Sequence, residues 1–248
     1  MTNPNKKAEV IVLAGGSGLR MNKGINKVFL ELMGIPILIR TLLKLESCPH
    51  ISRIIPVIRK EDEKEFQNLI KKFSLNKLTL PVTGGVERSD SVRKGLEFIR
   101  ANGNASYILT HDGARPFFSH ELIANLLNEI EGKNCVIPTI PVAETTRINR
   151  ANGQSAVIDR NLLSLTQTPQ AFSRNSLEEC FLSDSQGKLN LTDEASYFES
   201  LKYKVTQIPG EKWNIKITNP EDLDWAECLL NQFEELQLPE TIAELTKS

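Results

Sequence analysis

The side chains best suited to chemistry follow a glycine-rich segment near the amino terminus. The small residues there are succeeded by two cations, Arg20 and Lys27. Glycines let backbone N–H groups approach anionic oxygens closely, and nearby cations offset the negative charge. We therefore predict a polyphosphate-binding loop that consists of Ala14, Gly15, Gly16, Ser17 and Gly18.

A second group of candidate residues lies farther along the chain. Asp112 and Arg115 follow the apolar run 107–110. Mg²⁺ is commonly held by one or two carboxylates with phosphate oxygens and water, so Asp112 is a candidate ligand in a one-carboxylate site, although an aspartate here can also be a turn residue. Arg115 suits either a salt bridge or a phosphate clamp. Lys216, in a predicted short apolar strand, is costly to bury unless its amine meets an anion, but a lysine at a strand edge can also reach solvent.

The elements that must position these residues alternate between strands and helices. Helical spacing at 37–45 and 61–73 separates apolar runs and gives a β-α-β-α-β order, which is typical of a parallel sheet with right-handed crossovers. Ligands of such sheets bind outside the carboxyl ends of the strands. The predicted strands are 10–13, 53–58, 78–82 and 107–110.

Another glycine pair, Gly84-Gly85, precedes a predicted helix that ends near Asn102. Ser89 or Asp90 could cap this helix. The loop before the helix would lie at the same sheet edge as the first glycine loop and Asp112. These separate segments are therefore expected to form one site.

One region departs from the α/β pattern. Two strand-like runs flank Asn152-Gly153, which is a hairpin signal. We predict an antiparallel arm over about 141–165, of a kind that often exchanges between the two copies of a dimer. The arm belongs to a single predicted domain, 1–233, and an acidic tail follows at 234–248.

Composition and motif spacing exclude several classes of protein. The net charge of −1 gives no sign of a nucleic-acid partner, and no apolar run is long enough for a membrane span. We expect no nucleic-acid or membrane partner and a cytoplasmic location. The four cysteines are far apart and lack zinc-site spacing. A nicotinamide-binding domain is a weak alternative, because the position of the last fingerprint glycine is Met21, and no P-loop GK[ST] follows either. A non-catalytic interaction protein is a further alternative, which the retained charged residues disfavour.

Six motifs occur in order along the chain: AGGSGLRM, GGVERSDSV, HDGARPF, VIDRNLL with QTPQAF, LTDEAS and NIKITNPEDL. In this order and spacing they resemble the 2-C-methyl-D-erythritol 4-phosphate cytidylyltransferases over about residues 8–232. The related ribitol-5-phosphate cytidylyltransferases share most of the motifs, so a different polyol- or sugar-phosphate cytidylyltransferase is the alternative.

The resemblance implies a fold, a reaction and an assembly. The implied fold is a Rossmann-like, mostly parallel sheet flanked by helices, of the nucleotide-diphospho-sugar transferase type, with a projecting β-arm. The implied reaction joins CTP and 2-C-methyl-D-erythritol 4-phosphate to give the CDP-linked methylerythritol and pyrophosphate, a step of non-mevalonate isoprenoid synthesis. Mg²⁺ or another divalent cation and a homodimer with exchanged arms are also implied.

The resemblance also assigns residues. Its catalytic cations match Arg20, Lys27, Lys216 and Arg160, the last from the neighbouring subunit, and its metal ligand matches Asp112. The phosphate loop matches Ala14, Gly15, Gly16, Ser17 and Gly18, and the cytosine-selecting loop matches Gly85, Val86, Arg88 and Ser91. The remaining substrate contacts match Ala114, Arg115, Thr145, Gln167, Thr168 and Thr192.

Two departures from the family pattern affect the site. The family commonly has Pro-Lys-Gln around its motif lysine, whereas this chain has Asn26-Lys27-Val28. We expect the backbone around the lysine to be less fixed as a result. The arm motif, usually Asp-Thr-Ile-Lys, here begins with the longer acid Glu144, which affects the expected sugar-phosphate contacts.

Overall fold

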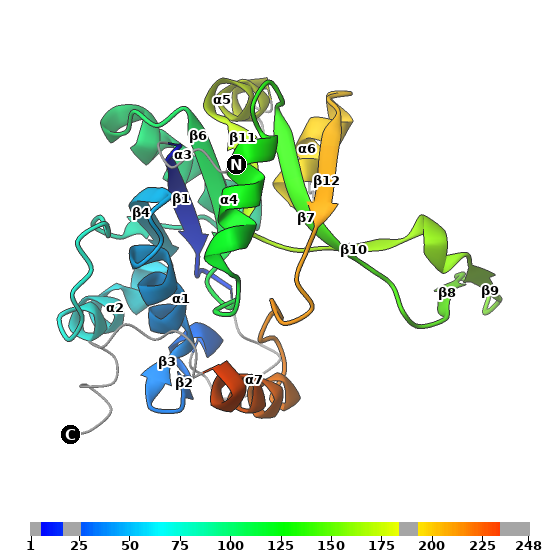
Figure 1. The fold of residues 1–248 in the computed structure, drawn as a ribbon, viewed down its shortest axis with the longest axis horizontal. Coiled ribbons are helices and arrows are strands. Elements are labelled where there is room, and N and C mark those ends of the chain that lie inside the picture. Colours follow the sequence, from blue (N-terminus) through cyan, green and yellow to red (C-terminus); the bar gives the residue numbers. More distant parts are fainter. Residues whose placement is uncertain (1–5, 17–25, 184–192, 234–248) are drawn as a thin grey trace.

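The computed structural model describes residues 6–16, 26–183 and 193–233, and its centre is an eight-stranded sheet (Figure 1). The strand order is β10-β7-β11-β6-β1-β4-β5, and β12 pairs with β7. The strands are β1 (Ala8–Leu13), β4 (Ile51–Ile58), β5 (Val82–Thr83), β6 (Tyr107–Asp112), β7 (Cys135–Pro141), β10 (Ser164–Thr166), β11 (Gln170–Ser173) and β12 (Val205–Pro209).

The parallel part of the sheet is built around β1. It pairs in parallel with β4 on one side and β6 on the other, and the last residue of β1, Leu13, lies opposite Val57 and Asp112. The carboxyl ends of three strands therefore meet at one edge. Strand β11 runs antiparallel between β6 and β7, and β10 is antiparallel to β7, so the sheet is mixed. The expected Rossmann-like, mostly parallel fold is confirmed.

Helices cover both faces of the sheet because successive side chains of a strand point to opposite sides. Val10 and Val12 of β1 share a core with α1, α2 and α4. Ile11, between them, belongs to a second core with α3, α5 and α6. The helices are α1 (Ile37–Glu46), α2 (Glu63–Ile70), α3 (Arg88–Asn102), α4 (His120–Glu129), α5 (Arg174–Ser183), α6 (Glu194–Ser200) and α7 (Glu221–Phe233), with short 3₁₀ helices η2 (Lys27–Phe29), η3 (Lys60–Asp62) and η4 (Arg160–Leu162).

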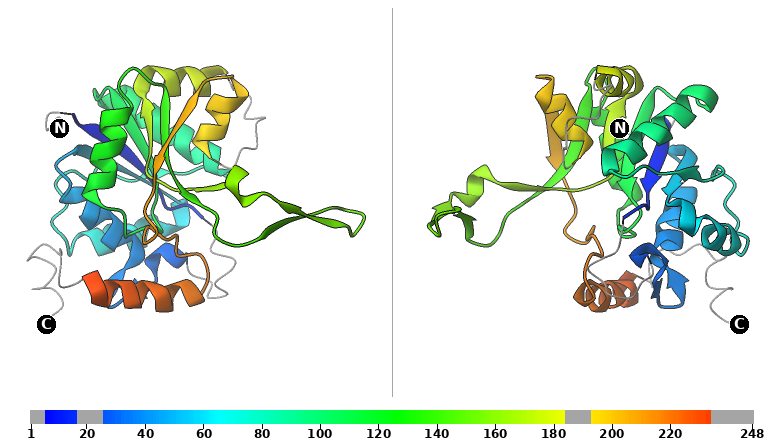
Figure 2. Two further views of the ribbon diagram at one scale, coloured as in Figure 1. Left: turned by 45° about the vertical axis from the view of Figure 1, so that its right-hand side comes forward. Right: turned by 180° about the vertical axis from the view of Figure 1, so that it is seen from behind.

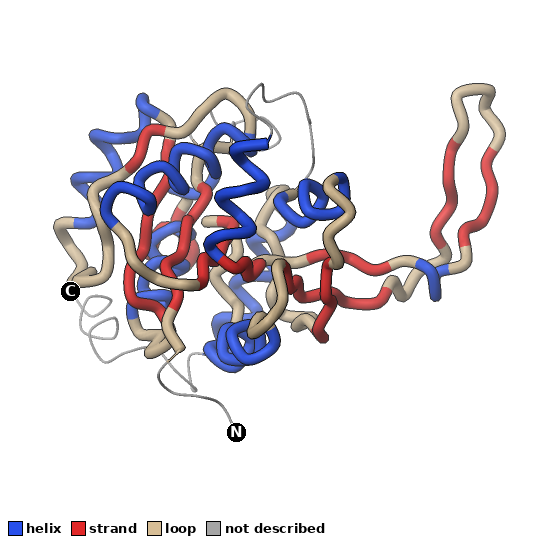
Figure 3. The backbone as a smooth tube through the Cα atoms, turned by 90° about the horizontal axis from the view of Figure 1, so that it is seen from above, coloured by secondary structure: helices blue, strands red, loops and turns tan. Residues whose placement is uncertain are grey.

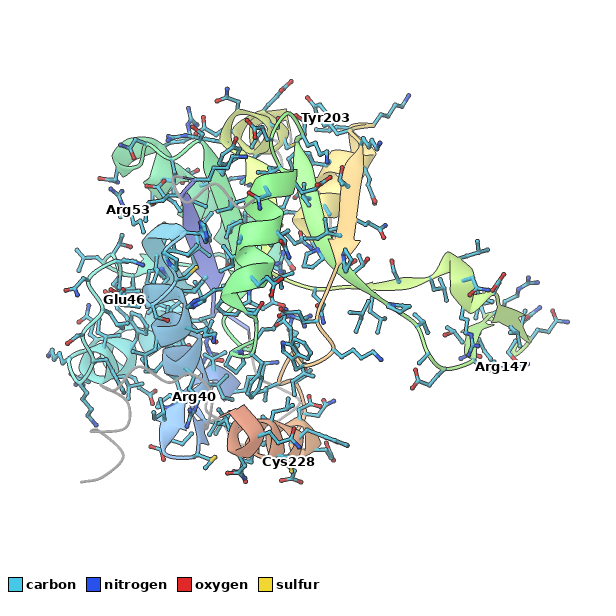
Figure 4. All side chains as sticks on the ribbon, viewed as in Figure 1. Arg40, Glu46, Arg53, Arg147, Tyr203 and Cys228 are labelled. Atoms are coloured by element: carbon cyan, nitrogen blue, oxygen red, sulfur yellow. The ribbon has the colours of Figure 1, made fainter. Side chains whose placement is uncertain are left out.

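A small hairpin, β2 (Glu31–Leu32) and β3 (Ile35–Pro36), lies beside α7. Arg40 of α1, which Figure 4 labels near α7, donates to the carbonyls of Leu32 and Met33 and thereby fixes the hairpin turn. Leu32 also joins Ile217 in a third apolar cluster with α7. Helix α7 thus packs against the segment that follows the glycine loop.

The predicted arm is confirmed as a projection from this body. Strands β8 (Thr146–Asn149) and β9 (Ser155–Ile158) form their own two-stranded sheet, which extends far from the main sheet and the helices that cover it in Figures 2 and 3. The hairpin turn contains Gly153 at φ +80°, a conformation that glycine adopts without strain. Arg147 lies near the far end of the arm (Figure 4).

Three local predictions are wrong. The strand predicted at 78–82 is reduced to β5, because Pro81 has no N–H for the ladder and only Leu78 bridges to Ile54. The segment around Lys216 is a loop and not the predicted strand. The N-cap of α3 is Glu87 and not Ser89 or Asp90. Asp90 takes part in the capping box from the third helical position, where its carboxylate accepts from the Glu87 N–H at 3.2 Å.

None of the helices in the described ranges is long and apolar enough to cross a membrane.

Candidate active site

A cavity of about 900 Å³ opens at the edge where β1, β4 and β6 end. Eleven of the residues predicted to bind substrate or metal line it, although they come from five separate segments of the chain. These residues are Ala14, Gly15, Gly16, Lys27, Gly85, Val86, Arg88, Ser91, Asp112, Ala114 and Lys216. The folded chain therefore brings together most of the site that the motifs indicate.

Four of the predicted residues lie outside the described ranges: Ser17, Gly18, Arg20 and Thr192.

The second glycine loop is held against the start of α3. The hydroxyl of Ser91 accepts from the Gly85 N–H at 3.1 Å and donates to the Glu87 carbonyl at 3.3 Å. A Cβ atom at Gly85 would lie 2.1 Å from that of Asp90, so only glycine fits here. Val86, at the tip of this loop, is 96% exposed and faces the cavity. The loop thus presents backbone groups and one apolar side chain to a ligand.

Asp112 is the charged centre of the cavity wall. Its Oδ2 atom lies 2.8 Å from the Lys216 Nζ and 3.3 Å from the Arg115 Nε, and its Oδ1 atom lies 3.7 Å from an Arg88 nitrogen. Burial alone would raise the pKa of the Asp112 carboxyl, but the three cations outweigh burial and hold this pKa well below its usual range. Asp112 is therefore ionised at neutral pH.

A buried carboxylate that the sequence did not reveal holds Arg88. Glu194, at the start of α6, is 1% exposed and forms an ion pair with Arg88. Its other oxygen accepts a hydrogen bond of 2.7 Å from the Thr110 hydroxyl. The only sequence signal was its place in the LTDEAS motif, where an acidic residue at a helix start is readily explained by the helix dipole.

The loop that carries Lys216 is fixed by hydrogen bonds to three of the predicted site residues, Gln167, Arg115 and Thr168. Gln167 donates to the carbonyls of Glu211 and Asn214, and Arg115 also donates to the Asn214 carbonyl at 2.8 Å. The Asn214 amide in turn donates to the Thr168 carbonyl at 2.9 Å. Gln167 and Thr168 are nearly buried, and none of Gln167, Thr168 and Arg115 lines the cavity. In this chain they position Lys216 and Asp112.

His111 continues this supporting layer beneath Asp112. The Asp112 N–H donates to the Thr168 hydroxyl at 3.0 Å, and this hydroxyl lies 3.1 Å from the His111 Nδ1. The other ring nitrogen, Nε2, lies 3.0 Å from the Arg115 carbonyl, which can only accept, so Nε2 carries the proton. Burial lowers the pKa of His111 to about 4. A neutral histidine therefore supports the backbone of Asp112 through the Thr168 hydroxyl.

The turn that carries Lys27 is well fixed, which corrects the expectation drawn from its departure from the family pattern. Asn26 is 1% exposed, and its amide donates to the Ala14 carbonyl and to the Asp62 carboxylate, both at 2.8 Å. Its oxygen accepts from the Val28 N–H at the start of η2. The side chain of Asn26 supplies the constraint.

The predicted acceptor residues on the arm lie away from the cavity. Thr145 and Arg160 are exposed, and neither lines it. The guanidinium of Arg160 donates to the Ala143 carbonyl at 2.7 Å within the arm. One chain therefore does not bring these two residues to its own cavity.

The residues present fit a divalent cation that arrives with a phosphate ligand. No group of three or more histidine, cysteine or acidic side chains in the described residues could cage a metal. Among the described residues, the ion-pair contact of Asp112 Oδ1 is the long one of 3.7 Å with Arg88, so this oxygen can accept a cation while Oδ2 keeps Lys216. One carboxylate with phosphate oxygens and water is a usual Mg²⁺ environment.

Comparisons with known proteins agree on one family. A family model described as IspD, 2-C-methyl-D-erythritol 4-phosphate cytidylyltransferase, matches residues 8–232. The chain is 39% identical over 224 residues to the enzyme of that name from Geobacillus kaustophilus, covering 90% of this chain and 96% of the relative. It is 36% identical over 222 residues to the one from Bacillus mycoides, covering 90% and 97%.

Solved structures give the same result. The 4-diphosphocytidyl-2C-methyl-D-erythritol synthase from Anaerococcus prevotii superposes with a TM-score of 0.79 at 30% identity, covering 91% of this chain and 96% of that one. The 2-C-methyl-D-erythritol 4-phosphate cytidylyltransferase from Thermus thermophilus gives 0.74 at 26% identity, covering 91% and 99%.

Proposed function

The chain belongs to the 2-C-methyl-D-erythritol 4-phosphate cytidylyltransferase family, and we infer that it transfers CMP from CTP to 2-C-methyl-D-erythritol 4-phosphate in non-mevalonate isoprenoid synthesis. Within the structure, one observation supports this most strongly. Gly15, Gly16, Lys27, Asp112 and Lys216 line one cavity at the carboxyl edge of the sheet. Backbone amides, cations and one carboxylate are what a nucleoside triphosphate requires.

The reaction needs little acid–base chemistry from the protein. A phosphate oxygen of the acceptor attacks the α-phosphorus of CTP, the new O–P bond forms, and the bond to the β-phosphate oxygen breaks to release pyrophosphate. The attacking oxygen is already anionic at neutral pH, so a strong general base is unnecessary. The protein accelerates the reaction in two ways. It positions the two anions, and it stabilises the negative charge that develops on the phosphoryl oxygens and the leaving pyrophosphate.

We assign the charge stabilisation to the cavity cations. Lys27 and Lys216 line the same cavity although they are far apart in the sequence. Arg20, outside the described residues, is the third proposed cation. Lys216 contacts Asp112 at 2.8 Å, so its position is set before substrate arrives. Preorganised charges of this kind need no rearrangement during the reaction.

Asp112 is the proposed ligand of a divalent cation, Mg²⁺ by preference. When bound, the cation neutralises part of the triphosphate charge. Asp112 stays ionised because Lys216, Arg88 and Arg115 lower its pKa, and Thr168 and His111 hold its backbone.

The cytosine is proposed to bind the Gly85–Ser91 loop. Backbone groups at Gly85 and Val86 can form directional hydrogen bonds with a base edge, and Ser91 keeps the loop in place. Ala114 lines the cavity beside Asp112.

The acceptor phosphate is proposed to meet Thr145 and Arg160 of a second copy of the chain, in a homodimer with exchanged arms. Two observations support this arrangement: the hairpin projects from the body (Figures 1 and 3), and neither residue lines the chain's own cavity. Thr192 is a further proposed contact that lies outside the described residues.

Pyrophosphate release tests the reaction and its specificity. The purified chain is assayed with CTP, UTP or ATP and with methylerythritol 4-phosphate or ribitol 5-phosphate, with and without Mg²⁺. We expect release with CTP, methylerythritol 4-phosphate and Mg²⁺ together. Faster release with ribitol 5-phosphate would assign the alternative acceptor, and release independent of added metal would contradict the role of Asp112.

Paired variants test the exchanged arm. Chains with Lys27→Ala and chains with Arg160→Ala are co-expressed with different tags, and the mixed dimer is isolated by both tags. If each site combines one body with the partner's arm, the mixed dimer has one intact site and about half the activity of the wild-type dimer at low acceptor concentration. Failure to exceed the two single-variant dimers would show that each chain uses its own arm.

A further inference from the structure

Asn26 lies where three segments of the chain meet. Its amide donates to the Ala14 carbonyl at the end of the first strand and to Asp62 in η3, both at 2.8 Å, while its own backbone begins the turn of Lys27. Both amide partners are obligate acceptors, so the orientation of the Asn26 amide is determined by its surroundings.

Asp62 is itself held in place, so the network is more than one pair of hydrogen bonds. Its two oxygens accept from the Arg59 Nε at 2.7 Å and Nη2 at 2.8 Å, a bidentate pair, and its exposed fraction is 6%. Arg59 lines the cavity, and its Cγ would lie 3.9 Å from a Cβ at Gly15. The network thus runs from the lysine turn to the glycine loop and back to the cavity wall.

The backbone around this network is fixed on each side. The Ala14 N–H donates to the Val57 carbonyl at 2.9 Å, which ties Ala14 to β4. The Phe29 N–H donates to the Asn26 carbonyl and the Leu30 N–H to the Lys27 carbonyl, at 2.9 and 3.1 Å. Asn26 is therefore the link between two anchored segments, of which one begins the glycine loop and the other carries Lys27.

We propose that Asn26, supported by Asp62 and Arg59, is a positioning residue that sets Lys27 relative to the phosphate-binding glycines. The proposal rests on the function proposed above for Lys27. Because Asn26 acts through Lys27, its contribution to the rate depends on the lysine being present.

Asn26→Asp is the sharpest variant. It keeps the size of the side chain and an oxygen for the Val28 N–H, but it removes both donations and places a negative charge beside Asp62. We expect kcat to fall by about 10-fold or more, because displacement of a catalytic group from its productive position is costly.

A double-mutant cycle separates positioning from general destabilisation. In the Lys27→Ala background, Asn26→Asp should lower kcat by less than about 2-fold, because the group that it positions is already absent. Equal effects in both backgrounds would overturn the proposal. If Lys27→Ala alone leaves kcat unchanged, the proposed role of Lys27 fails instead, so the two failures are distinguishable.

Two further variants complete the test. Asn26→Ala removes the same donors without adding a charge and replaces Asn26→Asp if that variant does not fold. Ser176→Ala on α5 is the matched control, since it removes hydrogen bonds of 2.7 Å to Asn134 and Ser173 far from the cavity. It should lower Tm without changing kcat.

Discussion

The nucleotide side of the cavity and the arm are held in opposite ways. Asp112 is largely buried, contacts three cations and rests on the Thr168 hydroxyl through its backbone. Arg160 and Thr145 on the arm are exposed, and the contact described for the Arg160 side chain is with the nearby Ala143 carbonyl. The position of Asp112 is thus set by contacts from several parts of the fold, whereas Thr145 and Arg160 flank a two-stranded hairpin.

Under the proposed function, this difference separates the two substrates. The charges proposed to hold the triphosphate come from one chain, from the ends of β1 and β6 and from the Lys216 loop. The proposed acceptor residues lie on a segment that leaves the body, so their position depends on what the arm contacts. Substitutions on the two sides should therefore affect different constants.

The largest expected effect is that of Lys27→Ala. Loss of one preorganised charge contact to the developing phosphoryl charge should reduce kcat by about 10²-fold or more. Steady-state kinetics measure this change, with Lys64→Ala on the exposed surface of α2 as the control. A loss of less than about threefold would exclude a transition-state role for Lys27 and weaken the contrast with the arm.

His111 tests how strongly the core side depends on its buried layer. Burial lowers its pKa to about 4, whereas an unfolded histidine has a pKa of about 6.5. Between these values the unfolded chain binds a proton that the folded chain does not. Stability therefore falls as the pH is lowered through this window, by up to roughly 3 kcal/mol.

Urea unfolding of the wild type and of His111→Asn at several pH values between 4 and 7 checks this sign. The substitution should remove most of that slope. Parallel curves would show that the pKa of His111 is the same in the folded and the unfolded chain, which would contradict the lowered pKa on which its neutral role beneath Asp112 rests.

Arg160→Ala measures the acceptor side. A charge-assisted hydrogen bond to a phosphate contributes about 1.5–3 kcal/mol, so the KM for methylerythritol phosphate should rise roughly 10- to 150-fold while that for CTP stays unchanged. Arg147→Ala is the matched control on the same arm, where the guanidinium contacts the Ser155 hydroxyl. An equal rise in both KM values would place Arg160 on the nucleotide side.

The body of the fold was predictable because its signals are local. Alternating apolar strands and helices predict the sheet, and the Asn152-Gly153 pair predicts the hairpin of the arm. Pairings between distant segments were not predictable. Nothing in the sequence indicates that Glu194 would hold Arg88, since an acidic residue at a helix start already has a local explanation.

The site shows the same limit. Asp112 and Lys216 were each recognised, but their ion pair depends on a loop that Gln167 fixes, and the apolar spacing around Lys216 indicated a strand instead. The motif Asn26-Lys27-Val28 was interpreted as a loss of backbone constraint because a proline fixes the backbone by itself. An asparagine does so only through partners that are distant in sequence, here Ala14 and Asp62.

The smallest expected effect compares two glycines of similar conformation. Gly153 in the arm has φ +80° and Gly132 after α4 has φ +71°, and a Cβ at either position would meet no atom within 4 Å. Alanine at such a φ costs about 1 kcal/mol whatever the surroundings. The two substitutions therefore introduce similar strain, one in a turn of the main body and one in the arm.

Gly132→Ala should lower the global free energy of unfolding by about 1 kcal/mol, because the turn after α4 joins the helix to β7 of the main sheet. Gly153→Ala should change it by less than about 0.5 kcal/mol, because the hairpin opens locally without the body. Urea unfolding gives the global value, and amide hydrogen exchange at Ile148 and Ala156, which face each other at a hydrogen-bonded position of the hairpin, reports its opening through a loss of protection. If Gly153→Ala lowers global stability as much as Gly132→Ala, the arm unfolds together with the body, and the two regions are one cooperative unit.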